Sequence, residues 1–351
     1  MPRKVAVIVP WWNGMRYLDG CLGSLAKMDC DGLDVSVLVL DNGSTDGSLA
    51  AIRAFPFVEL VETGANLGTA GGYSFGMRLA LERGCDYVYL LNQDTEVEPR
   101  FLVETVAAAE ADPKIGAAQS LLLQWPQVGS EPLVNSAGNA IHFLGFGYSF
   151  GYLKPVAPYL GGVRDVPYCS GAGLLLRCKA LREVGLMEEG YFMYHEDLDM
   201  GWKLRLAGWR NVIAPASVVW HKYEFSRSVK KYFWMERNRF IVLLGRLSAR
   251  SLAVLALPLL LAEIGMILPA ITGGWWREKL RVGAELLRPR TWALIRKLRA
   301  ETRRIRRASD REVVAFFTPV IESQETDGTF TRFIANPLMR LTWGLVRPLI
   351  R

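Results

Sequence analysis

Three stretches of this 351-residue chain carry side chains able to do acid–base or metal chemistry. The first is Asn92-Gln93-Asp94, which ends the apolar run YVYLL and precedes Thr95-Glu96. An aspartate at a strand end suits a divalent cation on a diphosphate, because Mg²⁺ and Mn²⁺ prefer oxygen ligands and borrow several from phosphate. Taken alone, the pattern is equally typical of a turn or a helix cap.

The second stretch is His195-Glu196-Asp197-Leu198-Asp199, in which four of five residues can ionise. Neighbouring carboxylates raise one another's pKa, which prepares one of them to act as a general base. We expect Glu196 and Asp199, three residues apart, to share a helix face, with Asp197 pointing elsewhere. The alternative is an acidic first turn of a helix, which the helix dipole favours.

His221, in the segment VVWHKYEF, is the third candidate. A single histidine after an apolar strand is usually a hydrogen-bonded structural residue. It becomes a candidate ligand only if a metal site lies nearby, because neutral imidazole commonly binds metals.

These candidates stand at the ends of segments that we expect to form a sheet. Strand-like runs alternate with segments of helical spacing; strands are expected at 5–10, 35–41 and 87–94, and helices at 17–28 and 72–83. The alternation predicts an α/β fold with a largely parallel sheet. Such sheets bind ligands at the carboxyl ends of their strands, where Pro10, Asp41 and Asp94 all fall.

The net charge of +7 is unevenly distributed along the chain. Residues 1–245 carry 23 Lys and Arg against 26 Asp and Glu, whereas residues 246–351 carry 19 against 9. The basic last third predicts an anionic partner, either nucleic acid or a membrane surface. No nucleic-acid-binding motif accompanies the arginines, so we expect no nucleic acid partner.

Leu252–Ile271 is a run of twenty residues with a single charge, Glu263, and two prolines, Pro258 and Pro269. Its length would just span a bilayer, but the prolines and the glutamate favour a re-entrant or interfacial segment. A buried hairpin of the core is the alternative.

Residues 291–307 follow, with Trp292, Ile295, Leu298 and Ile305 on one helical face and arginine or lysine over most of the rest. A basic amphipathic helix beside an apolar segment predicts binding to an anionic membrane surface. A solvated charged helix is the alternative.

The motifs taken together resemble family 2 glycosyltransferases, especially their bacterial rhamnosyltransferase-like branch. Their order along the chain is VPWWNG, VLDNGSTDGS, NLGTAGGYSFGM, LLNQDTEVEP, SGAGLLLR, HEDLDMGWKLRLAGW and ERNR. The resemblance covers roughly residues 4–245. It implies a GT-A fold, the Rossmann-like fold of nucleotide-diphospho-sugar transferases, over residues 1–245. We expect residues 246–351 to form a helical, membrane-associating extension.

The resemblance implies a nucleotide-sugar site on the N-terminal strands. Asp41 should hydrogen-bond the edge of the nucleobase, with Pro10 and Asn66 shaping the same pocket. Arg237 and Asn238 match an RN pair that relatives carry, and we expect them near the pyrophosphate of the donor.

The resemblance also implies a metal ion and a general base. Asp94 is similar to the surviving carboxylate of the DxD element that holds Mn²⁺ or Mg²⁺ on the donor diphosphate, with Asn92 in place of the first aspartate. His221 matches a histidine that completes this site in some relatives. Asp197 is similar to the base that takes the acceptor's proton, and Glu196 is the second choice.

These expectations describe an inverting transfer, because one base and no enzyme nucleophile give a single displacement. We expect a sugar, with rhamnose from dTDP-rhamnose favoured, to pass to a hydroxyl of a glycan, linked to a lipid, in cell-surface polysaccharide synthesis. Trp11-Trp12 and Ser74 depart from the family's usual residues and leave donor specificity open.

Five dispersed cysteines and the short apolar run ended by Pro10 fit a cytoplasmic protein, peripheral on the inner face of the membrane. Self-association into a homo-oligomer stays open. The sequence PWWNGM in place of GxGxxG excludes a Rossmann dehydrogenase. A polyprenyl-phosphate sugar synthase and a catalytically silent nucleotide-sugar-binding scaffold remain as alternatives.

Overall fold

A computed structural model of the chain describes residues 1–127, 129, 131–223, 229–322 and 328–351. In this part of the chain a ten-stranded sheet runs in the order β10-β12-β6-β11-β4-β1-β2-β3, with β5 beside β12 and β7 beside β6. Its strands are β1 Arg3–Trp11, β2 Leu33–Asp41, β3 Val58–Glu62, β4 Tyr87–Leu91, β5 Thr95–Val97, β6 Ile115–Gln124, β7 Val134–Ser136, β10 Arg164–Asp165, β11 Gly173–Arg177 and β12 Arg210–His221.

The sheet is mixed, which corrects the expectation of a largely parallel one. Strand β1 pairs in parallel with β2 and β4, and β2 does so with β3. Strand β11 runs antiparallel to both β4 and β6 and lies between them. The strand expected at 87–94 ends at Leu91, so that Asn92–Asp94 form a turn at the end of β4.

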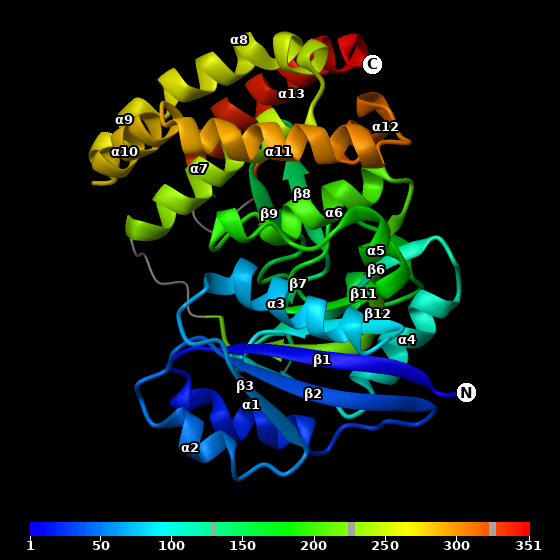
Figure 1. The fold of residues 1–351 in the computed structure, drawn as a ribbon. Helices are drawn as coiled ribbons and strands as arrows, with labels where there is room; N and C mark the ends of the chain where they lie inside the picture. The colour runs from blue at the N-terminus through cyan, green and yellow to red at the C-terminus, as the bar shows by residue number, and fades with distance from the viewer. Residues whose placement is uncertain (128, 130, 224–228, 323–327) are drawn as a thin grey trace.

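Helices cover both faces of the sheet and explain why successive residues of β1 are all apolar. Val5, Val7 and Val9 pack with α1 and α4 on one face, while Ala6 and Ile8 pack with α3, α5 and α6 on the other. The helices of this part are α1 Leu18–Leu25, α2 Ser48–Ile52, α3 Gly68–Glu82, α4 Phe101–Glu110, α5 Cys178–Val184 and α6 Glu196–Leu206. In Figure 1, α1 and α2 lie on one side of β1–β3 and α3 on the other.

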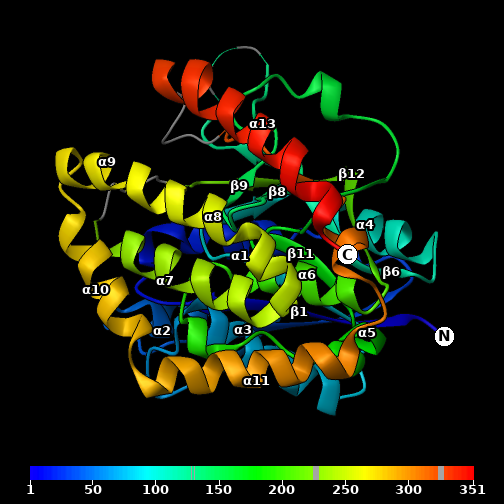
Figure 2. The same ribbon diagram turned by 90° about the horizontal axis from the view of Figure 1, so that it is seen from above.

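A helical layer, residues 229–351 as far as they are described, covers α6 and a small sheet. Figures 1 and 2 show it stacked over the main sheet. Its helices are α7 Val229–Arg246, α8 Ala249–Gly265, α9 Ile267–Thr272, α10 Trp276–Leu286, α11 Pro289–Ile305, α12 Asp310–Val314 and α13 Asn336–Val346. The small sheet has the order β13-β8-β9, from Phe317–Thr318, Asn139–His142 and Gly147–Ser149. Single short turns are η1 Met15–Tyr17, η2 Ala157–Tyr159, η3 Glu189–Tyr191, η4 Thr331–Ala335 and η5 Arg347–Leu349.

The expected division after residue 245 falls at the last turn of α7. Residues on its two sides share one hydrophobic core, in which Phe143 and Trp202 meet Leu298, Phe317 and Trp343. Strand β13 also pairs with β8 across this division. The basic C-terminal part is thus helical, as expected, and it packs directly on the sheet domain.

The two C-terminal segments singled out in the sequence bury their apolar side chains differently. On α11, Ile295, Leu298 and Ile305 are buried against the protein, which corrects the expectation that this face meets a membrane. Helices α8 and α9 together form an apolar stretch, Ala249–Thr272, and its most apolar 18-residue window has a mean hydropathy of 2.3 and is only 17% buried. Within the described residues, this is the one helical stretch long and apolar enough to cross a membrane.

Candidate functional site

The loops after β1 and β2 are tied together by their polar side chains. The buried Asp41 carboxylate accepts hydrogen bonds from the backbone N–H groups of Gly43 and Ser44, at 2.9 and 3.1 Å. The N–H of Asn13 donates to Ser44 Oγ at 3.0 Å, and Asn13 Oδ1 accepts from the N–H of Thr45 at 2.8 Å. Asp41 therefore orders its own loop, and its contact with a nucleobase stays a prediction.

Pro10 and Asn66 lie at the same corner, around the start of α3. A side chain at Gly72 would come within 3.2 Å of Pro10 Cβ, so glycine lets α3 approach the end of β1. Asn66 is exposed and its Oδ1 accepts from the N–H of Gly68 at 2.9 Å. Both residues thus border the end of the strand pair β1–β2, as a nucleotide pocket there would need.

Asp94 and His221 face each other across the ends of β4 and β12. His221 Nδ1 lies 2.9 Å from Asn135 Oδ1, and because an amide oxygen only accepts, this nitrogen carries the proton. The buried Nε2 is then left with a lone pair and without a hydrogen-bond partner, 3.5 Å from Asp94 Oδ1. Burial acts to raise the pKa of Asp94, and a positive charge opposite it, such as a protonated His221 together with Arg16, acts to lower that pKa below its usual value.

This pair fits a divalent cation. A nitrogen lone pair and a carboxylate oxygen that face each other at 3.5 Å repel unless a proton or a cation lies between them. Asn135 fixes the orientation of the imidazole, as partners of metal-binding histidines do. Among the described residues no group of three or more His, Cys, Asp or Glu is placed to hold a metal. A cation here would take its other ligands from donor phosphates and water.

Tyr73, which the sequence analysis did not single out, joins the two acidic elements. Its buried hydroxyl lies 2.7 Å from Asn92 Oδ1 and 2.8 Å from the carbonyl oxygen of Gly171. Burial raises its pKa well above the usual value, and the charges of Glu196, Asp94 and Asp197 raise it further. The Tyr73 hydroxyl therefore connects the turn of Asn92–Asp94 with Gly171, and Asn92 is turned toward it.

Asp197 is half-buried and held by backbone groups. Its Oδ2 accepts from the N–H of Gly171 at 3.2 Å, and its Oδ1 accepts from the N–H of Leu198 at 2.7 Å. Glu196 is buried, and its Oε2 has no hydrogen-bond partner. Burial raises the pKa of both carboxyl groups, and the charge of Asp197 raises that of Glu196 further. A carboxylate with a raised pKa is better suited to accept a proton.

Asp199 belongs to a different environment, which corrects the expected grouping with Glu196. Its two oxygens bind the Arg246 guanidinium at 2.6 and 2.7 Å, and both side chains are fully buried. The acidic stretch thus combines one structural ion pair with two carboxylates that face the strand ends.

A strained loop delivers Glu196 and Asp197 to their positions. Phe192, Tyr194 and His195 all have left-handed backbone, with φ of 65°, 63° and 70°. Such residues cost about 1 kcal/mol or more each and persist only where neighbours hold them. Asn238 Nδ2 lies within 3.0 Å of three carbonyl oxygens of this loop, those of residues 191, 193 and 194. Arg237 donates to the carbonyl oxygen of Gly190 at 2.9 Å.

The RN pair therefore positions the loop in this structure. Asn238 is fully buried, and its side-chain amide is committed to these carbonyl groups. Contact of either residue with the donor pyrophosphate stays a prediction. The sequence reveals the RN pair itself. It does not reveal which backbone groups the pair binds.

The chain was compared with known proteins. The family model described as "Glycosyl transferase family 2" matches residues 6–185. The chain is 35% identical over 211 residues to N-acetylglucosaminyl-diphospho-decaprenol L-rhamnosyltransferase of Mycobacterium tuberculosis, a match that covers 53% of this chain and 66% of the relative. It is 27% identical over 193 residues to poly-beta-1,6-N-acetyl-D-glucosamine synthase of Staphylococcus aureus, covering 52% of this chain and 42% of that protein.

Two solved structures resemble this fold at low sequence identity. GalNAc-T7 with UDP, GalNAc and Mn²⁺ aligns with a TM-score of 0.54 at 15% identity, over 71% of this chain and 49% of that one. The mannosyltransferase PcManGT of Pyrobaculum calidifontis with GDP-Man and Mn²⁺ aligns with a TM-score of 0.50 at 17% identity, over 86% of both chains. The predicted GT-A fold is thereby confirmed.

Proposed function

The chain belongs to glycosyl transferase family 2, and from that premise we propose that it is an inverting, metal-dependent glycosyltransferase. It moves a sugar from a nucleotide-diphosphate donor to a hydroxyl of a glycan acceptor. The observation that carries the proposal is the bridge through Tyr73, whose hydroxyl contacts Asn92 in the turn of Asp94 and the carbonyl oxygen of Gly171, the residue whose N–H group binds Asp197. One side can hold a donor diphosphate and the other can take up a proton.

Asp197 acts as the general base. It accepts the proton of the acceptor hydroxyl while that oxygen attacks the anomeric carbon and the bond to the diphosphate breaks. Two backbone N–H groups fix its carboxylate, and its partial exposure lets an acceptor reach it. Burial keeps Asp197 basic, and Glu196 is the second choice for the base.

Asp94 and His221 would hold Mn²⁺ or Mg²⁺. When bound there, the cation would supply positive charge opposite the leaving diphosphate, a contribution of several kcal/mol in metal-dependent transfer reactions. Asp41, Pro10 and Asn66 form the nucleoside end of the donor site, next to the strand ends that carry the metal pair. Asn92 supports the same turn through Tyr73.

The donor is dTDP-rhamnose, and the acceptor is a lipid-linked glycan of cell-surface polysaccharide synthesis. Support comes from the mycobacterial relative, whose printed name describes rhamnosyl transfer to an N-acetylglucosaminyl-diphospho-lipid. The match covers 66% of that relative, so its acceptor is carried over here as a proposal.

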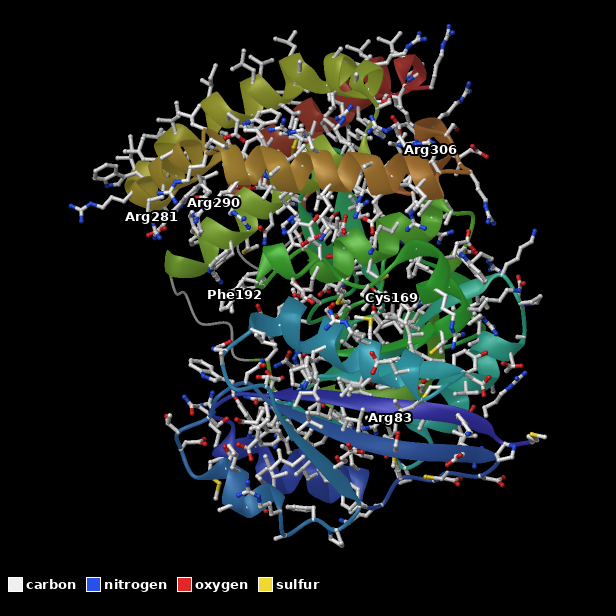
Figure 3. The ribbon with its side chains drawn as sticks, in the orientation of Figure 1. Arg83, Cys169, Phe192, Arg281, Arg290 and Arg306 are labelled. Atoms are coloured by element: carbon white, nitrogen blue, oxygen red, sulfur yellow. The ribbon has the colours of Figure 1, made fainter. Side chains whose placement is uncertain are left out.

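The enzyme works on the cytoplasmic surface of a membrane, bound through its helical layer. The exposed leucines and isoleucines of α8, α9 and α13 form an apolar surface, which we call the outer apolar face. Figure 3 shows the side chains of α8 and α9 pointing away from the rest of the protein. Large exposed apolar surfaces mark binding sites for membranes or proteins, and the basic residues of the same layer favour an anionic membrane.

A donor panel tests the reaction. The purified protein is incubated with nucleotide sugars, a GlcNAc-diphospho-lipid acceptor, and Mn²⁺, Mg²⁺ or EDTA. We expect turnover with dTDP-rhamnose, loss of turnover in EDTA, and inversion at the anomeric carbon. Turnover that survives EDTA would refute the metal, and retention of configuration would refute the single displacement.

A further inference from the structure

An open pocket of about 280 Å³ lies between α7, α10, the start of α11 and the loop before α6. Its wall combines three aromatic side chains with three charged ones; the lining residues are Gly190, Phe192, Phe233, Trp234, Arg237, Glu285 and Arg290. None of these residues belongs to the metal pair or to the acidic pair. The pocket is therefore separate from the metal pair and the acidic pair, and residues of the loop 190–195 line it.

The charge of the pocket is positive. Glu285 is buried, and its carboxylate forms ion pairs with three arginines: Arg290 at 2.9 Å, Arg288 at 3.0 Å and Arg237 at 4.0 Å. Arg237 and Arg290 line the pocket with Glu285, and Arg288 lies beside them through its ion pair with Glu285, so these four side chains carry two positive charges in excess. The side chains of Arg288 and Arg290 are 55% and 68% exposed and can turn toward a ligand. Guanidinium groups match phosphate oxygens in geometry and charge.

Exposed apolar side chains lie on α10 and directly after it, and α10 also carries the lining residue Glu285. Leu287, between Glu285 and the two exposed arginines, is itself 83% exposed, and Leu280 of α10 is 66% exposed. Trp276 at the start of α10 is 43% exposed. A ligand with a phosphate in the pocket would have a hydrocarbon surface beside it. This combination suits an amphiphilic phosphate better than a water-soluble nucleotide.

The pocket adjoins the loop that carries the proposed base. Phe192 lines it, stacks near Trp234 with ring centroids 5.0 Å apart, and precedes Glu196 by four residues. The carbonyl oxygen of Phe192 also accepts from the N–H of Ala70, at the start of α3 near Asn66. Figure 3 shows Arg281 and Arg290 on the helical layer, on the same side of the molecule as Phe192.

We propose that this pocket binds the phosphate groups of the lipid-linked acceptor, with the lipid chain leaving along Leu287 and α10. The inference rests on the proposed function, because it takes the acceptor class from there. It assigns the loop 190–195 a second role: one end of the loop contacts the acceptor phosphate and the other end presents the base to the acceptor hydroxyl.

Binding to the full-length protein tests the assignment without turnover. Affinity is measured by intrinsic fluorescence, to which Trp234 contributes, for three probes: a short-chain prenyl diphosphate, inorganic pyrophosphate and a nucleoside diphosphate with Mn²⁺. The test variant is Arg288→Gln/Arg290→Gln, which changes two exposed side chains, and its thermal midpoint is compared with that of the wild type to control for folding. The matched control is Arg303→Gln, an exposed arginine further along α11.

We expect the wild type to bind prenyl diphosphate more tightly than pyrophosphate. The double variant should lose about ten-fold or more in prenyl diphosphate affinity, because charge-assisted hydrogen bonds are removed. Arg303→Gln should bind as the wild type does, and nucleotide affinity should not change in either. An unchanged prenyl diphosphate affinity in the double variant would overturn the proposal. So would a loss confined to the nucleotide, which would assign the pocket to the donor, or equal affinities of the wild type for prenyl diphosphate and pyrophosphate.

The two proposals can fail separately. A wild type that binds prenyl diphosphate through Arg288 and Arg290 but transfers no sugar would refute the proposed reaction and keep the pocket. A wild type that transfers sugar, with the same acceptor KM in the double variant, would refute the pocket and keep the reaction.

Discussion

The sheet and the helical layer distribute polar and apolar side chains in opposite ways. In the sheet, strands such as β1 bury Val5–Val9 completely, and polar groups gather where the strands end. In the helical layer, Arg239 and Arg246 are fully buried in ion pairs, whereas leucines of α8 and α13 point outward. Helices on both faces of the sheet explain the first pattern, and the lipid contact that we propose would explain the second.

Helix α6 lies where the two regions meet and shows the difference within one turn. Asp199 faces the helical layer and is neutralised by Arg246, so its charge stabilises packing. Glu196 and Asp197 face the strand ends without a cationic partner among their hydrogen bonds, and burial raises the pKa of both. A buried charge with a counter-ion holds a structure together, while one without it is available for chemistry.

The largest effect should come from the metal pair at the strand ends. Asp94→Ala removes the carboxylate opposite His221, and because metal stabilisation of a leaving diphosphate contributes several kcal/mol, transfer should fall by about 10³-fold or more. Steady-state rates at saturating Mn²⁺ measure this. Glu104→Ala, a half-buried carboxylate on α4 that is paired with Arg100, is the control and should keep full activity. An active Asp94→Ala enzyme would place the metal elsewhere or remove it from the mechanism.

Asp197→Asn should reduce turnover by about 10²–10⁴-fold while donor affinity stays unchanged, because only the proton acceptor is lost. Burial raises the pKa of Asp197, so the base is protonated over a wider acidic range than an exposed aspartate. The wild-type rate should therefore rise with pH through a value above the usual range of Asp. Rate–pH profiles of both proteins, with Glu189→Gln as the exposed control, provide the check. A greater loss in Glu196→Gln than in Asp197→Asn would make Glu196 the base.

The sequence predicted the parts of this comparison that depend on local pattern. Apolar runs located β1, β2 and β4, and the polar residues that end them lie at one edge of the sheet because these strands are parallel. The antiparallel β11 could not be foreseen, because its pairing depends on contacts with β4 and β6, far away in sequence. The same holds for the pair formed by Asp199 and Arg246, 47 residues apart.

The two C-terminal helices show a second limit. Amphipathicity identified the apolar face of α11, but not that α6 and α7 would cover it. The more uniformly apolar α8 had no polar face to orient it, and in the structure it is the more exposed of the two. The role of Tyr73 also lay beyond the sequence, since its partners Asn92 and Gly171 come from two other loops.

Breaking the buried ion pair should affect folding more than chemistry. Arg246→Met leaves the Asp199 carboxylate buried without its counter-ion, which costs about 3–5 kcal/mol in comparable cases. Urea denaturation should show this loss, with α7 and α11 separating first because Arg246 also contacts Glu301 of α11 at 2.8 Å. Arg250→Met, an exposed arginine on α8, is the control. A variant as stable as the wild type would show that the layer does not depend on this pair.

The outer apolar face should hold the protein on a membrane. Leu260→Ser/Leu261→Ser/Leu268→Ser removes three side chains that are 57%, 58% and 68% exposed, and binding to anionic vesicles should weaken by about ten-fold or more. Co-sedimentation measures this. The control is Leu153→Ser/Leu160→Ser, two leucines equally exposed but outside the helical layer. Equal vesicle binding by both variants would assign the outer apolar face to contact with protein instead.

The smallest effect should be a change in how stability depends on pH. Burial, and then the charge of Asp197, raise the pKa of Glu196 in the folded protein above its value in the unfolded chain. The folded state then binds a proton that the unfolded state has lost, so stability falls as pH rises from the usual glutamate value to the raised one. Glu196→Gln cannot ionise and escapes this loss. Its thermal midpoint should match the wild type near about pH 5 and exceed it near about pH 8, by the equivalent of about 1 kcal/mol.

Asp199, paired with Arg246, gives the opposite case: Asp199→Asn should be less stable than the wild type at both pH values. If Glu196→Gln gained nothing at the higher pH, the carboxyl group would already be neutralised by a partner, and the contrast between the two sides of α6 would disappear.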